Sequence, residues 1–193
     1  MEPTHERSIG KRLAAILRHQ PELAGLTLDA QGWADVQALL TGLAALGDPI
    51  TPDELRHVVA HNPKQRFAIS EDGRRIRARQ GHSVPVELGL EPVTPPDVLL
   101  HGTGRGVLEA ILQEGLRPMA RTHVHLSASP EAAWQVAQRA PGKAVILEVD
   151  AGRLSAAGQE FWRTENGVWL TGPVAAEYLS VRSRARPTPT TRR

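Results

Sequence analysis

Residues 51–78, TPDELRHVVAHNPKQRFAISEDGRRIRA, change their hydrophobic period midway and thereby decide the fold class of this part of the chain. In the first half, apolar residues recur every three or four positions, which predicts a helix. Thr51 and Glu54 are spaced as a capping box, with proline at the first helical position. In the second half, apolar residues alternate in residues 66–70 and 74–78 around a Glu-Asp-Gly turn, which is typical of a β-hairpin.

Two further helices are predicted upstream of this stretch. One carries Ile9, Leu13, Ile16 and Leu17 on a single face and ends before Pro21. The other spans residues 33–46, with an apolar stripe. Three helices followed by a hairpin is the order of elements in a winged-helix module, an analogy that does not by itself establish nucleic-acid binding.

Downstream, residues 85–96 are rich in proline and lack a sustained period, so they predict an extended connector between residues 1–84 and 97–183. The remaining pattern predicts a mixed or antiparallel sheet with helices, in the order strand 98–100, helix 105–114, strand 123–126, helix from 129, strand 144–149, hairpin 161–170 and strand 178–181. The chain is therefore expected to be α+β, ending in a disordered basic tail at residues 184–193.

Composition excludes several classes of function. The chain has no cysteine, which rules out disulfides, thiolate metal sites and cysteine nucleophiles. There is no apolar run of about 18 residues and no secretory leader, so we expect a cytoplasmic protein without a membrane partner. The net charge is only +2, yet basic residues cluster in and around the hairpin, where they form either a phosphate-binding surface or a solvated face: Lys64, Arg66, Arg74, Arg75, Arg77 and Arg79.

A second polar pattern lies at residues 121–127, RTHVHLS. In a strand, Arg121, His123, His125 and Ser127 would share one face, while the two apolar residues between them would face the core. Such a face can be solvated, line a ligand cleft or bind a metal through its two histidines. A metal site would need a third ligand, and none stands at convincing spacing, so we expect no metal.

Residues 101–104, HGTG, stand where a strand is predicted to end and a helix to begin. A junction of this kind exposes backbone N–H groups, and glycine allows a phosphate or ribose to approach; a tight capped turn is the simpler interpretation. The chain has no Gly-x-Ser-x-Gly motif, no convincing carboxylate pair and no acidic cluster for magnesium. Its candidate sites consist of arginine and histidine, which suit phosphate binding and transfer.

Five motifs together resemble the KptA-type RNA 2′-phosphotransferases, and the resemblance covers residues 8–183. They are LRHQP at 17–21, NPKQRF at 62–67, QGHS at 80–83, HGT at 101–103 and HVHLS at 123–127. The resemblance implies an N-terminal winged-helix-like lobe that binds RNA. It also implies a C-terminal NAD-binding lobe with an ADP-ribosyltransferase-like sheet.

The resemblance also implies a reaction in which NAD is consumed as a co-substrate. An internal RNA 2′-phosphate, such as that left at a tRNA splice junction, attacks the nicotinamide-bearing ribose carbon. This step releases nicotinamide and forms an ADP-ribosylated RNA phosphate. The neighbouring ribose 2″-hydroxyl then attacks phosphorus, giving ADP-ribose 1″,2″-cyclic phosphate and RNA with a 2′-hydroxyl. We expect the enzyme to be a monomer.

Residue by residue, the resemblance assigns the catalytic set to Arg18, His19, Arg66 and Arg121, with Lys64 beside the phosphate. Three arginines can orient a phosphate dianion and stabilise the charge that develops on it. The adjacent Arg18 and His19 are expected to meet Arg66 from the hairpin and Arg121 from the second lobe. The residues that the resemblance assigns to NAD binding are His101, Gly102, Thr103, His125, Ser127, Gln80, His82 and Ser83.

Two other functions are compatible with these residues. One is an ADP-ribosyltransferase that stops after the first step and caps terminal phosphates of RNA or DNA. The other is a winged-helix nucleic-acid binder whose second lobe only senses NAD. The final hairpin has no match to the catalytic glutamate of protein ADP-ribosyltransferases, which favours RNA phosphate chemistry over protein modification.

Overall fold

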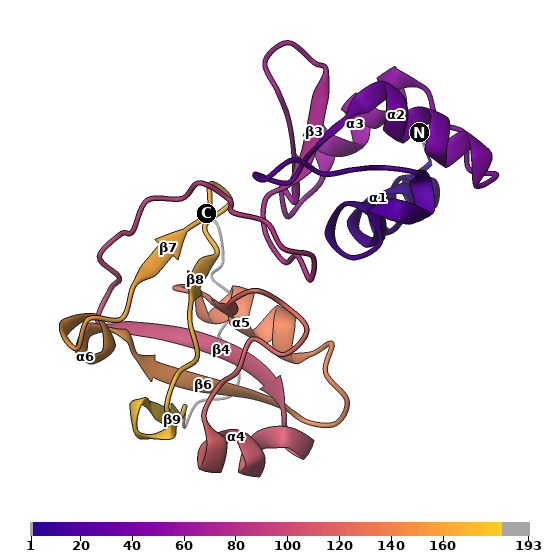
Figure 1. Ribbon diagram of the computed structural model, residues 1–193. Coiled ribbons are helices and arrows are strands. Elements are labelled where there is room, and N and C mark those ends of the chain that lie inside the picture. Colours follow the sequence, from indigo (N-terminus) through magenta and orange to yellow (C-terminus); the bar gives the residue numbers. More distant parts are fainter. Residues whose placement is uncertain (1, 183–193) are drawn as a thin grey trace, which may run out of the picture. The chain divides into compact units, whose positions relative to one another are not determined.

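The computed structural model describes residues 2–182, which form two compact units. The first unit contains the chain up to residue 90 together with residues 120–122, and the second contains residues 91–119 together with the chain from residue 123. Helices and antiparallel sheets occur in both units (Figure 1), which confirms the α+β class. The tail predicted at residues 184–193 lies outside the described residues.

The first unit packs helices against a small antiparallel sheet of strand order β1-β3-β2. Leu13, Ile16, Leu39, Phe67 and Ile76 are among its most deeply buried side chains. They come from both helices and strands, so the predicted amphipathic faces share one core. The elements are α1 (Pro3–Arg18), η1 (Pro21–Ala24), β1 (Trp33–Asp35), α2 (Val36–Ala45), α3 (Pro52–His61), β2 (Phe67–Ile69) and β3 (Arg75–Ala78).

The start of α3 and the hairpin that follows it are confirmed. The Glu54 carboxylate accepts a hydrogen bond from the Thr51 N–H at 2.8 Å, and the Thr51 hydroxyl accepts one from the Glu54 N–H at 3.2 Å. This reciprocal pair is the predicted capping box. In the hairpin, β2 pairs with β3 and the turn glycine Gly73 has a φ of 71°, which a side chain would disfavour.

The helix predicted at residues 33–46 is wrong at its start. Trp33–Asp35 forms β1, which pairs with residues 75–77 of β3, and α2 begins only at Val36. The Asp35 carboxylate caps α2 by accepting a hydrogen bond from the Ala38 N–H at 2.8 Å. A strand partner 40–44 residues away therefore overrides the local helical pattern of these three residues.

The second unit contains two antiparallel sheets, of strand order β4-β6-β9 and β5-β8-β7, bridged where Leu100 pairs with Ser127. The predicted central strand is confirmed as β6, and the final hairpin as β7 and β8. The elements are β4 (Val98–Gly104), η2 (Arg105–Val107), α4 (Leu108–Glu114), β5 (Val124–Leu126), α5 (Pro130–Ala137), β6 (Ala144–Asp150), α6 (Ala151–Ala156), β7 (Phe161–Arg163), β8 (Trp169–Thr171), η3 (Ala176–Tyr178) and β9 (Leu179–Val181).

The predicted end of the first strand at residue 100 is wrong, because β4 continues to Gly104 and residues 101–104 all pair with β6. The helical start predicted at Arg105 is confirmed by η2. Gly102 has a packing role in β4. A Cβ at this position would overlap the backbone carbonyl oxygen of Ala133 on α5. The glycine thus allows α5 to lie directly on the sheet.

Replacing Gly102 with alanine is expected to lower the free energy of unfolding by about 2 kcal/mol, because the helix must move away from the strand. Chemical denaturation of the purified variant measures this loss. Gly106→Ala is the matched control, since a Cβ there meets no atom within 4 Å. Equal stability of the Gly102→Ala variant and the wild type would contradict the packing role.

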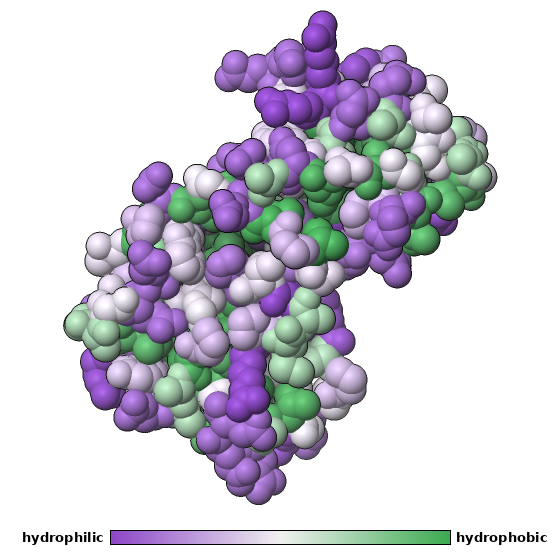
Figure 2. Space-filling model, in the orientation of Figure 1, coloured by the Kyte–Doolittle hydropathy of each residue, from purple (hydrophilic) through white to green (hydrophobic). Residues whose placement is uncertain are grey.

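Hydrophobic and hydrophilic residues are interspersed on the face of the molecule seen in Figure 2. Several large apolar side chains are exposed, and Met119 is the most exposed of them at 87%. Within residues 2–182, no helix is both long enough and apolar enough to cross a bilayer.

Candidate active site

Arg18 is the last residue of α1, at the point where Pro21 prevents the helix from continuing. Burial, together with the positive charges of Arg66 and Arg121, lowers the pKa of Arg18 to about 10. The Nε and Nη2 atoms of Arg18 are buried and have no hydrogen-bond partner among the described residues. The guanidinium is therefore still charged at neutral pH, yet no carboxylate within residues 2–182 forms an ion pair with it.

Residues 81–83 run beside the end of α1 and contact both Arg18 and His19. Gly81 has a φ of 88°, and a Cβ on it would lie 3.4 Å from the guanidinium carbon of Arg18. The Ser83 N–H donates to the Arg18 carbonyl at 2.9 Å. The Ser83 hydroxyl lies 2.9 Å from Nδ1 of His19. This segment thus fixes the backbone and the side chains of the two neighbouring residues.

His82 is completely buried, with 0% of its surface exposed. Neither of its ring nitrogens has a hydrogen-bond partner among the described residues. Burial, followed by the charges of Arg18, His19 and Arg77, lowers the pKa of His82 to about 4. His82 is therefore neutral at neutral pH, and it does not add a positive charge next to Arg18.

Arg66 is positioned by a turn that begins at Asn62, directly after α3. The buried Asn62 side-chain oxygen accepts hydrogen bonds from the backbone N–H groups of Lys64 and Arg66, both at 3.3 Å. Gln65, between them, has a φ of 43°, a left-handed conformation that side chains seldom adopt. The motif NPKQRF thus encodes a tight turn that presents Arg66 before β2 begins.

Arg121 belongs to the short segment of residues 120–122 that packs within the first unit. The Thr122 N–H donates to the His82 carbonyl at 3.2 Å. The charge of Arg121 lowers the pKa values of both Arg18 and His19. All four residues of the predicted catalytic set therefore lie in one unit of the structure, and no described carboxylate forms an ion pair with its three arginines.

The strand predicted at residues 123–126 is confirmed as β5, which begins one residue later, at Val124. Val124 and Leu126 are buried in β5 as the alternation requires, but Arg121 lies outside the strand. Arg121 therefore does not share a strand face with His125.

The residues predicted to bind NAD divide between the two units. Gln80, His82 and Ser83 are in the first unit, and His101, Gly102, Thr103, His125 and Ser127 are in the second. In the second unit, Nδ1 of His101 donates to the His125 carbonyl at 3.1 Å, and Nδ1 of His125 donates to the His123 carbonyl at 2.9 Å. These bonds fix both rings, and no group of three metal-binding side chains occurs within residues 2–182.

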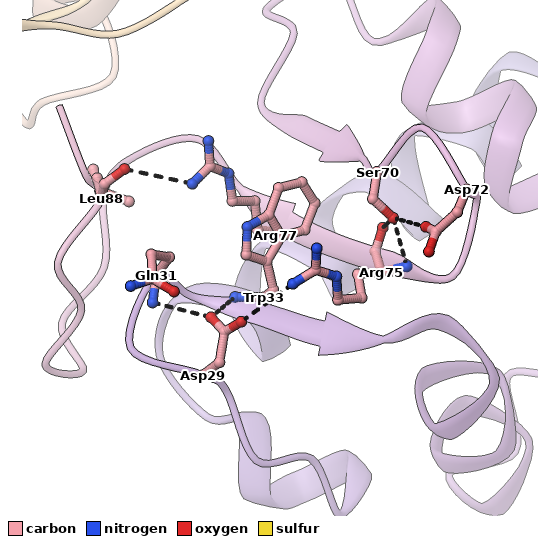
Figure 3. A network of polar contacts seen from close by, with 8 residues as sticks. All are labelled: Asp29, Gln31, Trp33, Ser70, Asp72, Arg75, Arg77 and Leu88. Carbon is pink, nitrogen blue, oxygen red and sulfur yellow. Dashed lines mark hydrogen bonds and ion pairs between the residues drawn. The ribbon is translucent and has the colours of Figure 1, made fainter.

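Sequence reasoning missed a polar network on the hairpin sheet that includes Trp33 (Figure 3). The guanidinium carbons of Arg77 and Arg75 lie 4.6 and 5.4 Å from the centre of the Trp33 ring. Asp29 forms an ion pair with Arg75 at 3.7 Å, and Arg77 donates to the Leu88 carbonyl at 3.5 Å. The basic hairpin is therefore an organised surface rather than a set of separately solvated arginines.

This network also anchors the chain that follows the active-site segment. The Leu88 contact fastens the connector to the sheet, and the Glu87 N–H donates to the Ala30 carbonyl at 2.7 Å. The sequence does contain a signal for this network. Asp35 is a helix-capping residue two positions after Trp33, which indicates that the helix starts after Asp35 and leaves Trp33 outside it. The prediction of one helix over residues 33–46 concealed this signal.

Comparison with known proteins places the chain in a family. The family model "RNA 2'-phosphotransferase, Tpt1 / KptA family" matches residues 4–172. A protein of Agrobacterium fabrum named "Probable RNA 2'-phosphotransferase" is 56% identical over 171 residues, which cover 89% of this chain and 91% of that protein. Proteins with the same name from Hahella chejuensis and Streptomyces coelicolor are 52% identical over 91% of this chain and 49% identical over 93% of it, and the matches cover 94% and 97% of those proteins. The chain belongs to the Tpt1/KptA family of RNA 2′-phosphotransferases.

Proposed function

We propose that this protein transfers an internal RNA 2′-phosphate to NAD. The products would be RNA with a 2′-hydroxyl, nicotinamide and ADP-ribose 1″,2″-cyclic phosphate, formed through an ADP-ribosylated RNA phosphate. The observation that carries this proposal is the grouping of Arg66, Arg121 and His19 around Arg18, without a carboxylate counter-ion among the described residues. In this proposal the first unit is a winged-helix-like RNA lobe, and the second is an ADP-ribosyltransferase-like NAD lobe.

The charge distribution supports binding of a phosphate dianion at the three arginines. Arg18 is held in a position where its charge is costly, since burial and two like charges all lower its pKa. A dianion would supply the missing counter-charge and accept hydrogen bonds from the buried Nε and Nη2 atoms. The same arginines can stabilise the charge that spreads over the phosphate oxygens during the second step.

His19 is suited to proton transfer in the second step. Burial and the charges of Arg18 and Arg121 lower its pKa, so the imidazole is neutral at physiological pH and can accept a proton. We assign His19 to take the proton of the attacking 2″-hydroxyl and return it to the departing RNA 2′-oxygen. The proton count balances, because one hydroxyl is lost and one is formed.

The second unit offers groups that fit the nicotinamide end of NAD. Leu100 uses its backbone N–H and C=O for the bridge to Ser127, at 2.8 and 2.9 Å. Since backbone groups alternate in direction along a strand, the N–H and C=O of Gly102 point to the same edge of β4. This N–H donor and C=O acceptor lie side by side and complement a carboxamide. His101, whose ring is fixed by its hydrogen bond, directly precedes Gly102 in the strand.

The test is to incubate the protein with NAD and an oligonucleotide that carries one internal 2′-phosphate. Mass analysis is expected to find free nicotinamide, the cyclic phosphate and the oligonucleotide with a 2′-hydroxyl. An oligonucleotide with a 2′-hydroxyl throughout and a 5′-phosphate is the matched control, and it should remain unchanged. The proposal fails if neither the dephosphorylated RNA nor the cyclic phosphate appears.

The same experiment separates the alternatives. Accumulation of an ADP-ribosylated terminal phosphate on the control oligonucleotide would favour the capping activity. Binding of RNA and NAD without turnover of either would favour the sensor.

A further inference from the structure

We propose that Ser83 is a positioning residue that acts through His19. It would hold the imidazole in one orientation while the opposite ring nitrogen changes its protonation state. The inference rests on the proposed function, in which His19 transfers a proton. It gives Ser83 a role in proton transfer in place of a direct contact with NAD.

The first observation is that Ser83 is fixed relative to His19 by its backbone. The Ser83 N–H donates to the carbonyl of Arg18, the residue before His19, at 2.9 Å. The preceding carbonyl, that of His82, accepts a hydrogen bond from Thr122. The hydroxyl then lies 2.9 Å from Nδ1 of His19. Both side chains are exposed, so the bond orients the ring where the packing of a core does not.

The second observation is that the hydrogen-bond partner of Nδ1 in His19 is a hydroxyl. His61, His101 and His125 each place Nδ1 against a backbone carbonyl, which can only accept a hydrogen bond. A carbonyl therefore holds the proton on Nδ1. A hydroxyl can both donate and accept, so it can serve either tautomer of His19 by rotating its hydrogen.

This difference matters for a histidine that both takes and gives a proton. When Nδ1 of His19 donates to Ser83, Nε2 has a lone pair and can accept the proton of a substrate hydroxyl. The resulting imidazolium still donates to Ser83 through Nδ1, and Nε2–H can then protonate the leaving oxygen. When Nδ1 instead accepts from Ser83, Nε2 begins as the donor. The ring keeps its place in every one of these states.

The first test uses the protein without RNA or NAD, so it does not depend on the proposed reaction. Nitrogen-15 NMR of the imidazole rings reports the tautomer of His19, whose signals are identified by their loss in His19→Asn. Ser83→Ala is expected to shift the Nδ1 signal of His19, whereas Ser83→Thr, which retains a hydroxyl, should not. Identical His19 signals in the wild type and Ser83→Ala would overturn the proposal.

The second test is kinetic, with the 2′-phosphorylated oligonucleotide and enzyme in excess. Ser83→Ala is expected to lower the rate at saturating NAD roughly 3- to 10-fold, the range for loss of one hydrogen bond, without raising the KM for NAD. Ser83→Thr should restore most of the rate. Ser8→Ala, at an exposed serine on α1, is the matched control and should leave the rate unchanged.

A double-mutant comparison separates positioning from direct contact with NAD. If Ser83 acts only through His19, the variant with both His19→Ala and Ser83→Ala should be as slow as His19→Ala alone. A further loss in the double variant, or a raised KM for NAD in Ser83→Ala with an unchanged maximal rate, would assign Ser83 to NAD and overturn the proposal. Absence of turnover in the wild type would refute the proposed function, while the NMR result would still decide whether Ser83 orients His19.

Discussion

Arg18→Met is expected to lower 2′-phosphate transfer at least about 1000-fold while leaving the fold intact. Removal of one preorganised charged group from a phosphoryl-transfer site commonly costs 10³–10⁵ in rate. Methionine retains the apolar stem of the side chain but lacks the guanidinium, which lies beside Gly81, so it cannot donate to a phosphate. Single-turnover rates with the 2′-phosphorylated oligonucleotide measure the loss.

The same substitution is expected to raise the free energy of unfolding by about 1–3 kcal/mol, since it replaces a buried, unneutralised charge with an apolar group. Burial, Arg66 and Arg121 all disfavour the Arg18 cation in the folded protein. A gain in stability together with a loss of activity is the signature of a charge retained for function.

Arg12→Met is the matched control on the same helix. Arg12 is exposed and paired with Asp48, so its replacement should change both transfer and stability little. The role of Arg18 would be refuted by an Arg18→Met variant that turns over at the rate of Arg12→Met.

Elements whose signals are local could be predicted from the sequence. The capping box at Thr51 and the turn at Gly73 depend on residues within a few positions of each other, and both are confirmed. Trp33 and Gly102 depend on distant partners instead. Trp33 becomes part of a strand because β3 lies beside it, and Gly102 is enclosed by α5.

In the candidate site, too, features that depend on distant partners could not be predicted from the local sequence. The family resemblance identified Arg18, His19, Arg66 and Arg121 as a set, but periodicity put Arg121 on a strand of the second lobe. Arg121 instead belongs to the first unit, where the N–H of its neighbour Thr122 donates to the His82 carbonyl. The full burial of His82 was equally hidden, because a histidine beside glycine and serine has the local composition of an exposed loop.

That burial predicts a specific acid sensitivity. The pKa of His82 is about 4 in the folded protein, against 6.5 as its ordinary value. Between pH 6.5 and pH 4 the unfolded chain binds a proton at His82 that the folded protein does not bind. The free energy of unfolding therefore falls as the pH falls. The loss begins near pH 6.5, is complete near pH 4 and amounts to about 3 kcal/mol through His82 alone.

Urea denaturation at pH 7, 5.5 and 4 measures this loss. His82→Gln is polar but does not titrate. Its free energy of unfolding is expected to fall by about 3 kcal/mol less than that of the wild type between pH 7 and pH 4. His82→Leu should show the same reduced pH dependence, whatever its stability at pH 7. Equal losses in the wild type and both variants would show that His82 does not titrate in this range. In Arg18→Met the loss should become smaller but persist, because burial lowers the pKa of His82 more than the charge of Arg18 does.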